Sequence, residues 1–457
     1  MTKVSQEAGE RIGQDSRYDR TGSVTTNVAD GFTMVAVGDL IITRPLTKSH
    51  IAGFREVLEV FQRADVTFGN LETNVFDIRY FNGSPQAEYG GAYHVSLPEL
   101  GPDLRAMGFS LLSRANNHSL DWGLEGMRET SRILDQNAII HAGVGENLAQ
   151  ARAARFLETA RGRVALVSFA STFTPLSRAA DPAGEAPGRP GVNSLRLKRT
   201  VVVPEDLLDG LRRVRDALPD SKPTDENAKE VVLAGTKYAT SNKPGYSYEA
   251  DAHDVTGILQ SVRSGKQFAD FCIATNHGHE PGNWSQYPPD YERLFAHNII
   301  DAGADAYVVH GPHQLRGVEI YRDRPIFYGL GNFIMDDLRT PVGADMYIAY
   351  GKDPRVDTDA DVTAAEMTRG YASAPALSDP VFYESVVTVA QFQGNQLSEL
   401  LLYPIELGHS NRLANRGVPR LASGRQARAI LERLQFLSIQ FETQIEIEGE
   451  IGIIKLR

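Results

Sequence analysis

Five short apolar runs of the sequence each end in residues whose side chains could bind a metal ion or move a proton. These residues are Asp39, Asn70 with Glu72, Asn116 with Asn117 and His118, His277 with His279 and Glu280, and His310 with His313. Carboxylate and amide oxygens and imidazole nitrogens suit Mn, Fe or Zn and, with water completing the shell, Ca or Mg. The side chains do not distinguish among these ions. Because the groups lie far apart in the chain, they predict a divalent metal centre assembled by the fold.

The same side chains could carry out acid-base chemistry beside such a metal. A divalent ion flanked by imidazoles and carboxylates can activate water for hydrolysis, or polarise a carbonyl group while neighbouring groups remove and return a proton. The candidates for proton transfer are Asp39, His118, Asp121, His279, Glu280 and His313. Asp121 stands three residues after His118. It could therefore orient that imidazole, or it could instead cap a helix that begins near Gly123.

Each of these positions also has a purely structural interpretation. Asp39 could cap a helix, and Glu72 could be a solvated loop carboxylate. Asn117 and His118 could form a buried hydrogen-bonded pair that closes a turn. One of the two histidines in the segment 310–313 could be structural. The presence of all five motifs in one chain favours the functional interpretation.

Strands that end in polar loops must position these groups. The five runs are short, apolar and followed by polar residues, and they cover residues 32–39, 66–72, 109–118, 268–280 and 306–313. Helical patterns precede three of them, at 54–63, 98–107 and 291–302. A further apolar strand, 164–170, leads into a loop with no obvious ligand set. This alternation predicts a layered α/β domain with helices on both faces of the sheet and ligands at the carboxyl ends of the strands.

Composition excludes several classes of partner. The formal net charge of -11 argues against nucleic acid and against an anionic membrane surface. No run of about 18 apolar residues occurs, so no membrane-spanning helix is expected. The single cysteine, Cys272, lies in an apolar run and is expected to be a buried structural thiol. With no secretory pattern at the start of the sequence, we expect a cytoplasmic protein.

The chain divides into three parts by its sequence patterns. Residues 1–31 are polar throughout and predict a disordered tail. Residues 32–404 carry all the motifs and predict the catalytic domain, with insertions near 175–250 and 340–380; the second could be a lid or a plain surface excursion. Residues 405–457 predict a C-terminal extension with a helix at 425–441 and a strand-like alternation at 444–456.

The order of the motifs resembles that of the CapA family, named for a protein of poly-γ-glutamate capsule synthesis. The matching segments are GD at 38–39, GNLE at 69–72, NNHSLDWG at 116–123, HGPH at 310–313 and GLGNF at 329–333. The resemblance covers roughly residues 32–404. It implies a calcineurin-like metallophosphoesterase fold, an α/β layered sandwich, whose metal-binding loops include the Asn-His and His-x-x-His elements.

Two departures from the family pattern concern the metal centre. The Asp-x-His opening of ordinary phosphoesterases is absent, because Ile41 stands two positions after Asp39, and this favours one bound metal ion over two. The segment NHGHE at 276–280 matches the family's His-Trp-Gly-x-Glu element only with a shift of one residue. It leaves open whether the first or the second histidine faces the site. The metal ligands expected from the motifs are Asp39, Glu72, Asn117, His277, His310 and His313.

The resemblance implies three candidate functions. Members that act on capsule polymers usually carry a membrane anchor or export signal, so a cytoplasmic tailoring enzyme is the first expectation. Such an enzyme would epimerise a residue from L to D at its Cα in a peptide of the lasso type or in a polyglutamate-like substrate. The second candidate is a metal-dependent hydrolase of an amide or phosphoester, and the third is a non-catalytic component of poly-γ-glutamate synthesis. No motif in the sequence distinguishes the two chemistries.

Overall fold

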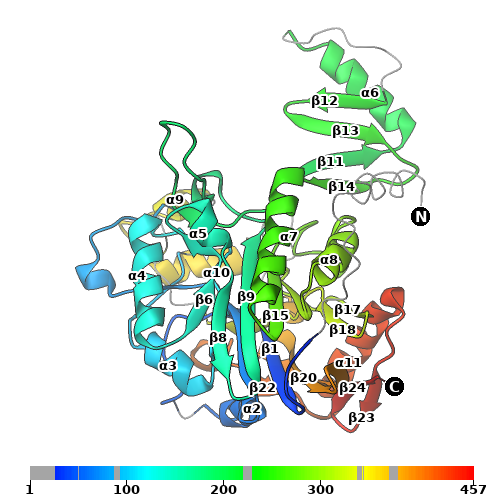
Figure 1. Cartoon of the computed structure of the whole chain (residues 1–457). Coiled ribbons are helices and arrows are strands. Elements are labelled where there is room, and N and C mark those ends of the chain that lie inside the picture. Colours follow the sequence, from blue (N-terminus) through cyan, green and yellow to red (C-terminus); the bar gives the residue numbers. More distant parts are fainter. Residues whose placement is uncertain are drawn as a thin grey trace.

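The computed structural model describes residues 26–49, 51–86, 93–219, 229–336, 342, 344–369 and 379–456. Two β-sheets pack face to face, and helices cover the outer face of each sheet (Figure 1). A smaller sheet with its own helix projects from one end of this sandwich (Figure 1). The predicted layered α/β architecture with helices on both faces is confirmed, with two sheets in the middle.

The larger sheet has ten strands. Its main path is β23-β24-β21-β20-β1-β2-β5-β6, and β19 and β22 join it beside β1 and β21. Its strands are β1 (Phe32–Ile41), β2 (Val66–Leu71), β5 (Leu111–Ser113), β6 (Ile140–Ala142), β19 (Asn332–Met335), β20 (Glu384–Gln393), β21 (Gln396–Glu406), β22 (Arg420–Leu421), β23 (Glu446–Glu448) and β24 (Ile451–Lys455). Because β1, β2, β5, β6 and β19 pair in parallel, their carboxyl ends meet at one edge.

The smaller sheet of the sandwich has six strands in the order β17-β18-β16-β15-β9-β8. They are β8 (Arg155–Thr159), β9 (Gly162–Ala170), β15 (Phe271–His277), β16 (Ala306–His310), β17 (Val318–Tyr321) and β18 (Arg324–Phe327). Two-stranded ladders join β3 (Asn74–Val75) to β4 (Val95–Ser96), and β7 (Val144–Gly145) to β10 (Gly191–Val192). In the central part of this sheet β9, β15, β16 and β18 run parallel, so a second set of carboxyl ends forms.

Helices pack on the outer faces and at one end of the sandwich. The helices on the larger sheet are α2 (Phe54–Phe61), α3 (Leu100–Met107) and α4 (Gly123–Gln136), and those on the smaller sheet are α7 (Ala252–Gln267) and α8 (Glu292–Asp301). The helix α11 (Gly424–Ser438) buries its apolar side in the core between the sheets. Further helices are α5 (Leu148–Arg152), α9 (Ala344–Ala349) and α10 (Asp359–Arg369). No helix in the described ranges is both long and apolar enough to span a bilayer.

The alternation of side chains along β1 explains the layering. Met34 and Ala36 pack in the core between the two sheets, which also contains Ile273 of β15. Val35 and Val37 point the other way and pack under the outer helices. Successive strand residues face opposite sides, so a strand that is apolar throughout requires cover on both faces. In the outer core of the smaller sheet, the cysteine at 272 is buried as predicted.

The insertion predicted near residues 175–250 contains a folded unit, which we call the inserted sheet. Its strand order is β12-β13-β11-β14. It comprises β11 (Leu197–Val203), α6 (Glu205–Asp216), β12 (Glu230–Leu233), β13 (Thr236–Thr240) and β14 (Gly245–Ala250). Because the polar and charged residues of this segment alternate with few apolar ones, its strands were not evident from the sequence. The unit projects beyond α7 in Figure 1.

The two ends of the domain differ from the predicted boundaries. Residues 26–31, assigned to the tail, pack on the domain: the Thr26 hydroxyl donates a hydrogen bond to Asp305, and Val28 is buried in the core between the sheets. Residues 1–25 of the predicted tail lie outside the described residues. The C-terminal segment completes the larger sheet, because β24 pairs with β21. In the predicted 340–380 insertion the structure describes α9 and α10, whereas residues 340, 341, 343 and 370–378 lie outside the described part.

Candidate metal centre

The carboxyl ends of the parallel strands bring the predicted residues together at the seam between the two sheets. In the larger sheet, Asp39 of β1 lies opposite Asn70 of β2 and Asn332 of β19. In the smaller sheet, His277 at the end of β15 lies opposite His310 at the end of β16. Parallel strands end at a common edge, which is why residues from distant parts of the chain meet there.

Asp39 is placed by a close approach between two strands. The register of β1 shifts at this residue, where its neighbour β19 begins. A Cβ atom on Gly38 would lie 1.9 Å from the carbonyl oxygen of Gly331, and the Asp39 amide donates to that same oxygen at 3.1 Å. Only glycine at position 38 permits this approach, which points the following carboxylate into the seam.

The Asp39 carboxylate is 1% exposed and contacts groups from both sheets. Asn70 Nδ2 donates to its Oδ1 at 2.8 Å, and the Gly311 amide donates to its Oδ2 at 3.0 Å. His313 Nδ1 lies 3.5 Å from the same Oδ2. Burial raises the pKa of this carboxyl, but the contact with His313 and the charges of the nearby histidines outweigh burial and hold the pKa well below its ordinary value. Asp39 therefore stays an anion at neutral pH.

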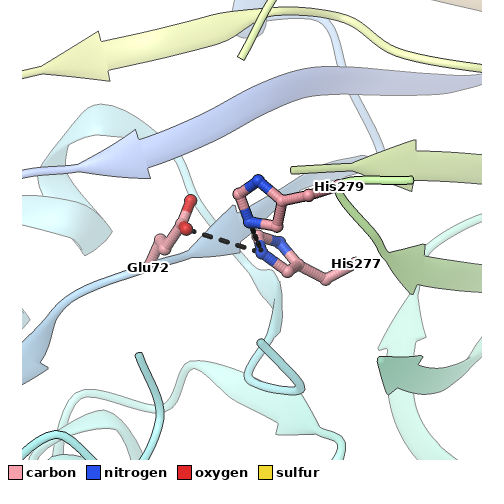
Figure 2. A group of neighbouring side chains, drawn as sticks. All are labelled: Glu72, His277 and His279. Carbon is pink, nitrogen blue, oxygen red and sulfur yellow. Dashed lines mark hydrogen bonds and ion pairs between the residues drawn. The ribbon is translucent and has the colours of Figure 1, made fainter. Parts of the chain in front are cut away.

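Two groups of three potential metal ligands share Glu72. One group joins Glu72 to His277 and His279, and the other joins it to Asp39 and His313; within each group the ligand atoms lie within 4.8 Å of one another. Figure 2 shows the first group, in which His277 Nε2 is 3.5 Å from Glu72 Oε1 and 3.1 Å from His279 Nε2. A carboxylate between two ligand groups can bridge two ions. The five side chains could hold one ion or two adjacent ions, whereas the sequence favoured one metal ion.

The charge states of these residues suit a cation. Burial, reinforced by the charge of His279, lowers the pKa of His277 well below its ordinary value. Burial, reinforced by the charge of His313, lowers the pKa of His279 to about 3. Both imidazoles are therefore neutral near pH 7 and present lone pairs, and Glu72 adds a fully buried carboxylate. Neutral imidazoles and carboxylate oxygens are the ligands that Mn, Fe and Zn accept, so the residues fit a divalent ion.

Asn117 offers a further oxygen ligand. Its Oδ1 is buried and has no hydrogen-bond partner within the described part of the chain. Leaving a buried acceptor unsatisfied costs about 1–3 kcal/mol, a cost that coordination would remove. The neighbouring Asn116 is engaged, because its Nδ2 donates to Asn70 Oδ1 at 3.1 Å and to the carbonyl oxygen of Leu71 at 2.9 Å. Of the two adjacent asparagines, Asn117 is therefore the candidate ligand.

His310 does not belong to the ligand set, contrary to the sequence-based expectation. Its Nε2 is 2.9 Å from the carbonyl oxygen of Val37, and its Nδ1 is 3.1 Å from Thr275 Oγ1. Both ring nitrogens are thus occupied by groups of the fold. Because Val37 belongs to β1 and His310 to β16, this imidazole ties the two sheets together.

His118 lies beside the shared carboxylate but belongs to neither ligand group. Its Nδ1 is 2.6 Å from Asp121 Oδ2, and its Nε2 is 3.8 Å from Glu72 Oε1. The helix α4 begins after Trp122 without a side-chain cap, so of the two roles considered for Asp121 the geometry favours the orienting one. Burial raises the pKa of Asp121 despite the opposing effect of His118. A carboxylate on Nδ1 holds the ring so that Nε2 faces the centre.

The loop after β15 presents two more of the predicted residues. His279 Nδ1 is 2.7 Å from Asn283 Oδ1, which turns its other nitrogen toward His277. Sequence left open which of the two histidines faces the site, and the structure directs both toward it. Glu280 lies outside both ligand groups.

Sequence reasoning missed the residues that hold Glu280 and those that flank His118. Ser171 Oγ and Thr172 Oγ1 donate to the two oxygens of Glu280 at 2.9 and 3.0 Å. Both residues directly follow β9, in a loop for which the sequence showed no obvious ligand set. The pattern that could have identified them is a pair of hydroxyl residues after a buried strand. The His94 ring is buried 4.4 Å from the His118 ring. No strand-end pattern marks that position.

The fold and the site define a layered α/β protein with candidate metal ligands gathered at the seam between its two sheets. The chain matches the family described as "Bacterial capsule synthesis protein PGA_cap" over residues 33–337. The match spans more than half of the chain, and the chain belongs to this family. The resemblance to CapA stated from the motifs is thereby confirmed.

The relatives align with different fractions of the chain. Two Sinorhizobium fredii (strain NBRC 101917 / NGR234) proteins, y4sH and y4uA, are each 65% identical over 461 residues, which covers 100% of both chains. The capsule biosynthesis protein CapA of Bacillus anthracis is 24% identical over 329 residues, 70% of this chain and 64% of that protein. Among solved structures, a chain described as a novel phosphatase from Mycoplasma pneumoniae aligns with a TM-score of 0.33 and 7% identity, covering 89% of this chain and 99% of that one.

Proposed function

We propose that this protein is a metal-dependent hydrolase of an amide-linked substrate, a peptide or a polyglutamate-like chain. The observation that carries the proposal is the sharing of Glu72 by two ligand groups with a separately oriented imidazole, His118, beside it. Two adjacent cation positions and one proton-transfer group match the needs of hydrolysis. The amide-linked class is taken from relatives named for the synthesis of glutamate polymers, CapA of Bacillus subtilis among them.

We assign metal binding and proton transfer to different residues of this chain. Asp39, Glu72, His277, His279 and His313 would hold the ions, and Asn117 would add an amide oxygen. Divalent metal ions bound there polarise a carbonyl or phosphoryl oxygen and make water a stronger nucleophile.

Proton transfer falls to His118. Asp121 holds its Nδ1 at 2.6 Å, so Nε2 is the atom that gives a proton to the departing amine. Asp121 also stabilises the positive charge that this ring carries before the transfer. General acid catalysis of this kind contributes about 100- to 10,000-fold.

Epimerisation at a peptide Cα is the second candidate, and Glu280 is the observation that favours it. Inversion requires two proton-transfer groups on opposite sides of the substrate. Glu280 is held by two hydroxyls, lies outside the ligand groups, and could serve opposite His118. Family resemblance together with the expected cytoplasmic location had placed epimerisation first. We rank hydrolysis above epimerisation because Glu72 is shared by two ligand groups and could bridge two ions, and epimerisation requires no second ion.

Labelling with solvent deuterium separates the two reactions. The metal-loaded protein is incubated in deuterated water with peptides and with γ-linked glutamate oligomers, and the products are analysed by mass spectrometry and chiral chromatography. Hydrolysis yields shorter chains with no deuterium at Cα. A full-length product with an inverted Cα centre and about one added mass unit would instead support epimerisation over hydrolysis. Turnover that persists in a strong chelator would refute the metal-dependent proposal.

A further inference from the structure

A groove lies between the inserted sheet and the loop that follows β15. It has a volume of about 510 Å³, and its walls are formed by β11, β14 and residues 281–290. In the β11–β14 ladder Val201 pairs with Tyr246 and Arg199 with Tyr248, so Val201 and the two tyrosines share one face. The opposite wall includes Trp284. Tyr246 and Trp284 are 41% and 47% exposed, which is high for residues of this size.

The groove adjoins the metal centre through a shared loop. Pro281, which lines the groove, follows Glu280, and Asn283, which lies beside Trp284, accepts the contact from His279 at 2.7 Å. Burial and the nearby Glu280 carboxylate raise the pKa of Tyr248 to about 12. A chain lying in the groove would therefore extend toward the reacting position.

The lining is uncharged except for one carboxylate. Among the described residues that line the groove, none is Lys, Arg or His, and the single acid, Asp290, accepts a hydrogen bond from the Tyr248 amide at 2.9 Å. Arg199 lies over the Tyr246 ring, 5.5 Å from its centroid, and is not part of the lining. Arg316 also lies behind the wall, where its Nε donates to the carbonyl oxygen of Ser285 at 3.1 Å. The lining itself offers no cation to pair with a polymer that bears a carboxylate on every unit.

We propose that this groove binds an uncharged, apolar segment of a peptide substrate next to the unit that reacts at the metal centre. The inference rests on the proposed function and deepens it, because it names a substrate class that excludes poly-γ-glutamate. Aromatic and proline side chains offer large contact area at low entropic cost, and they are the walls on which extended peptides dock. Gly282 leaves room for this wall, since a Cβ there would lie 2.3 Å from Trp284 Nε1.

Tryptophan fluorescence reports occupancy directly. The chain has two tryptophans, and Trp122 is buried at 6% exposure, so acrylamide quenches mainly Trp284. The full-length, metal-loaded protein is titrated with three probes: the acetylated and amidated hexapeptide Ala-Leu-Pro-Ala-Leu-Pro, γ-linked hexaglutamate and cellohexaose. We expect the uncharged peptide to shield Trp284 from acrylamide and the other two to leave quenching unchanged. Tighter binding of hexaglutamate or cellohexaose, or no binding of the peptide, would overturn the proposal.

A pair of lysine substitutions on one strand supplies the control. Val201→Lys places a cation in the groove, and we expect peptide affinity to fall about tenfold or more. Thr200→Lys adds the same charge on the opposite face of β11, because Thr200 pairs with Ser247, and should leave affinity unchanged. Equal affinities in the two variants would refute the groove as the binding site. Because binding is measured without turnover, a failed hydrolysis assay with intact peptide binding would count against the proposed function alone.

Discussion

The candidate ligands at the seam are buried and held by neighbours, whereas the aromatic residues of the groove stand exposed on the inserted sheet and on the loop that follows β15. Asp39 is 1% exposed and accepts two hydrogen bonds within the fold, while Trp284 is 47% exposed. Chemistry at a metal requires groups fixed to within a fraction of an ångström, which packing between two sheets provides. Recognition of a chain requires accessible surface. In our proposals, reaction and substrate binding therefore depend on separate parts of this protein, which meet at residues 281–290.

The largest losses of bound metal and of turnover are expected when Glu72, the shared carboxylate, or Asp39 is substituted. Glu72→Gln and Asp39→Asn keep the size of the side chain but remove the charge, so we expect metal content to fall and turnover to drop about 100-fold or more. Metal content is measured by mass spectrometry of the purified protein. Asp135→Asn, an exposed site with 74% side-chain exposure, is the matched control and should change neither quantity. Full metal content in both seam variants would show that these residues are structural.

The next effect separates metal binding from proton transfer. In His118→Gln we expect kcat to fall about 100-fold with metal content preserved, because the imidazole belongs to neither ligand group. Asp121→Asn should lower kcat less, about tenfold, since it acts through His118. Both values come from steady-state kinetics at fixed metal concentration. A loss of metal in His118→Gln would place this residue among the ligands and contradict its assignment.

Two histidines of one motif provide a sharper contrast. His313→Gln should lower metal content. His310→Gln should leave metal content unchanged and lower the unfolding free energy by about 1–3 kcal/mol, because its contacts with Val37 and Thr275 join the two sheets. Chemical denaturation of the metal-free proteins measures this difference. The same response in both variants would mean that the two imidazoles share one role.

The smallest expected effect is the change in stability when N-terminal residues are removed. We predict that removal of residues 1–25 leaves the melting temperature and activity unchanged, because their composition is polar. Removal of residues 1–31 should lower the unfolding free energy by about 1.5–3 kcal/mol, since it also deletes the buried Val28. Thermal unfolding of the two truncated proteins tests the boundary. A drop already present in the shorter deletion would show that the first 25 residues contribute to the fold.

Local sequence pattern was sufficient for the strands that carry the candidate site and for four helices, α2, α3, α8 and α11, but it did not identify β20, β21 or α7. The run 32–39 became β1, 268–280 contains β15, and the helical pattern at 54–63 became α2. Apolar periodicity predicts these elements because burial on one or both faces is what stabilises them. The inserted sheet was not recognised, because its strands are mostly half-buried and the apolar runs in β11 and β12 are only three residues long.

By itself the sequence determined the fold class, the family and the set of strand-end residues from which the centre is drawn. Only the tertiary structure decided the role of each one. His310 and His313 are three residues apart, yet the first contacts Val37 and Thr275 while the second faces Asp39. The physical reason is that residue type and spacing specify which groups reach the sheet edge, but the partner of each nitrogen depends on the strand that packs across the seam. Glu72 became the shared carboxylate in the same way, through contacts with residues more than 200 positions away.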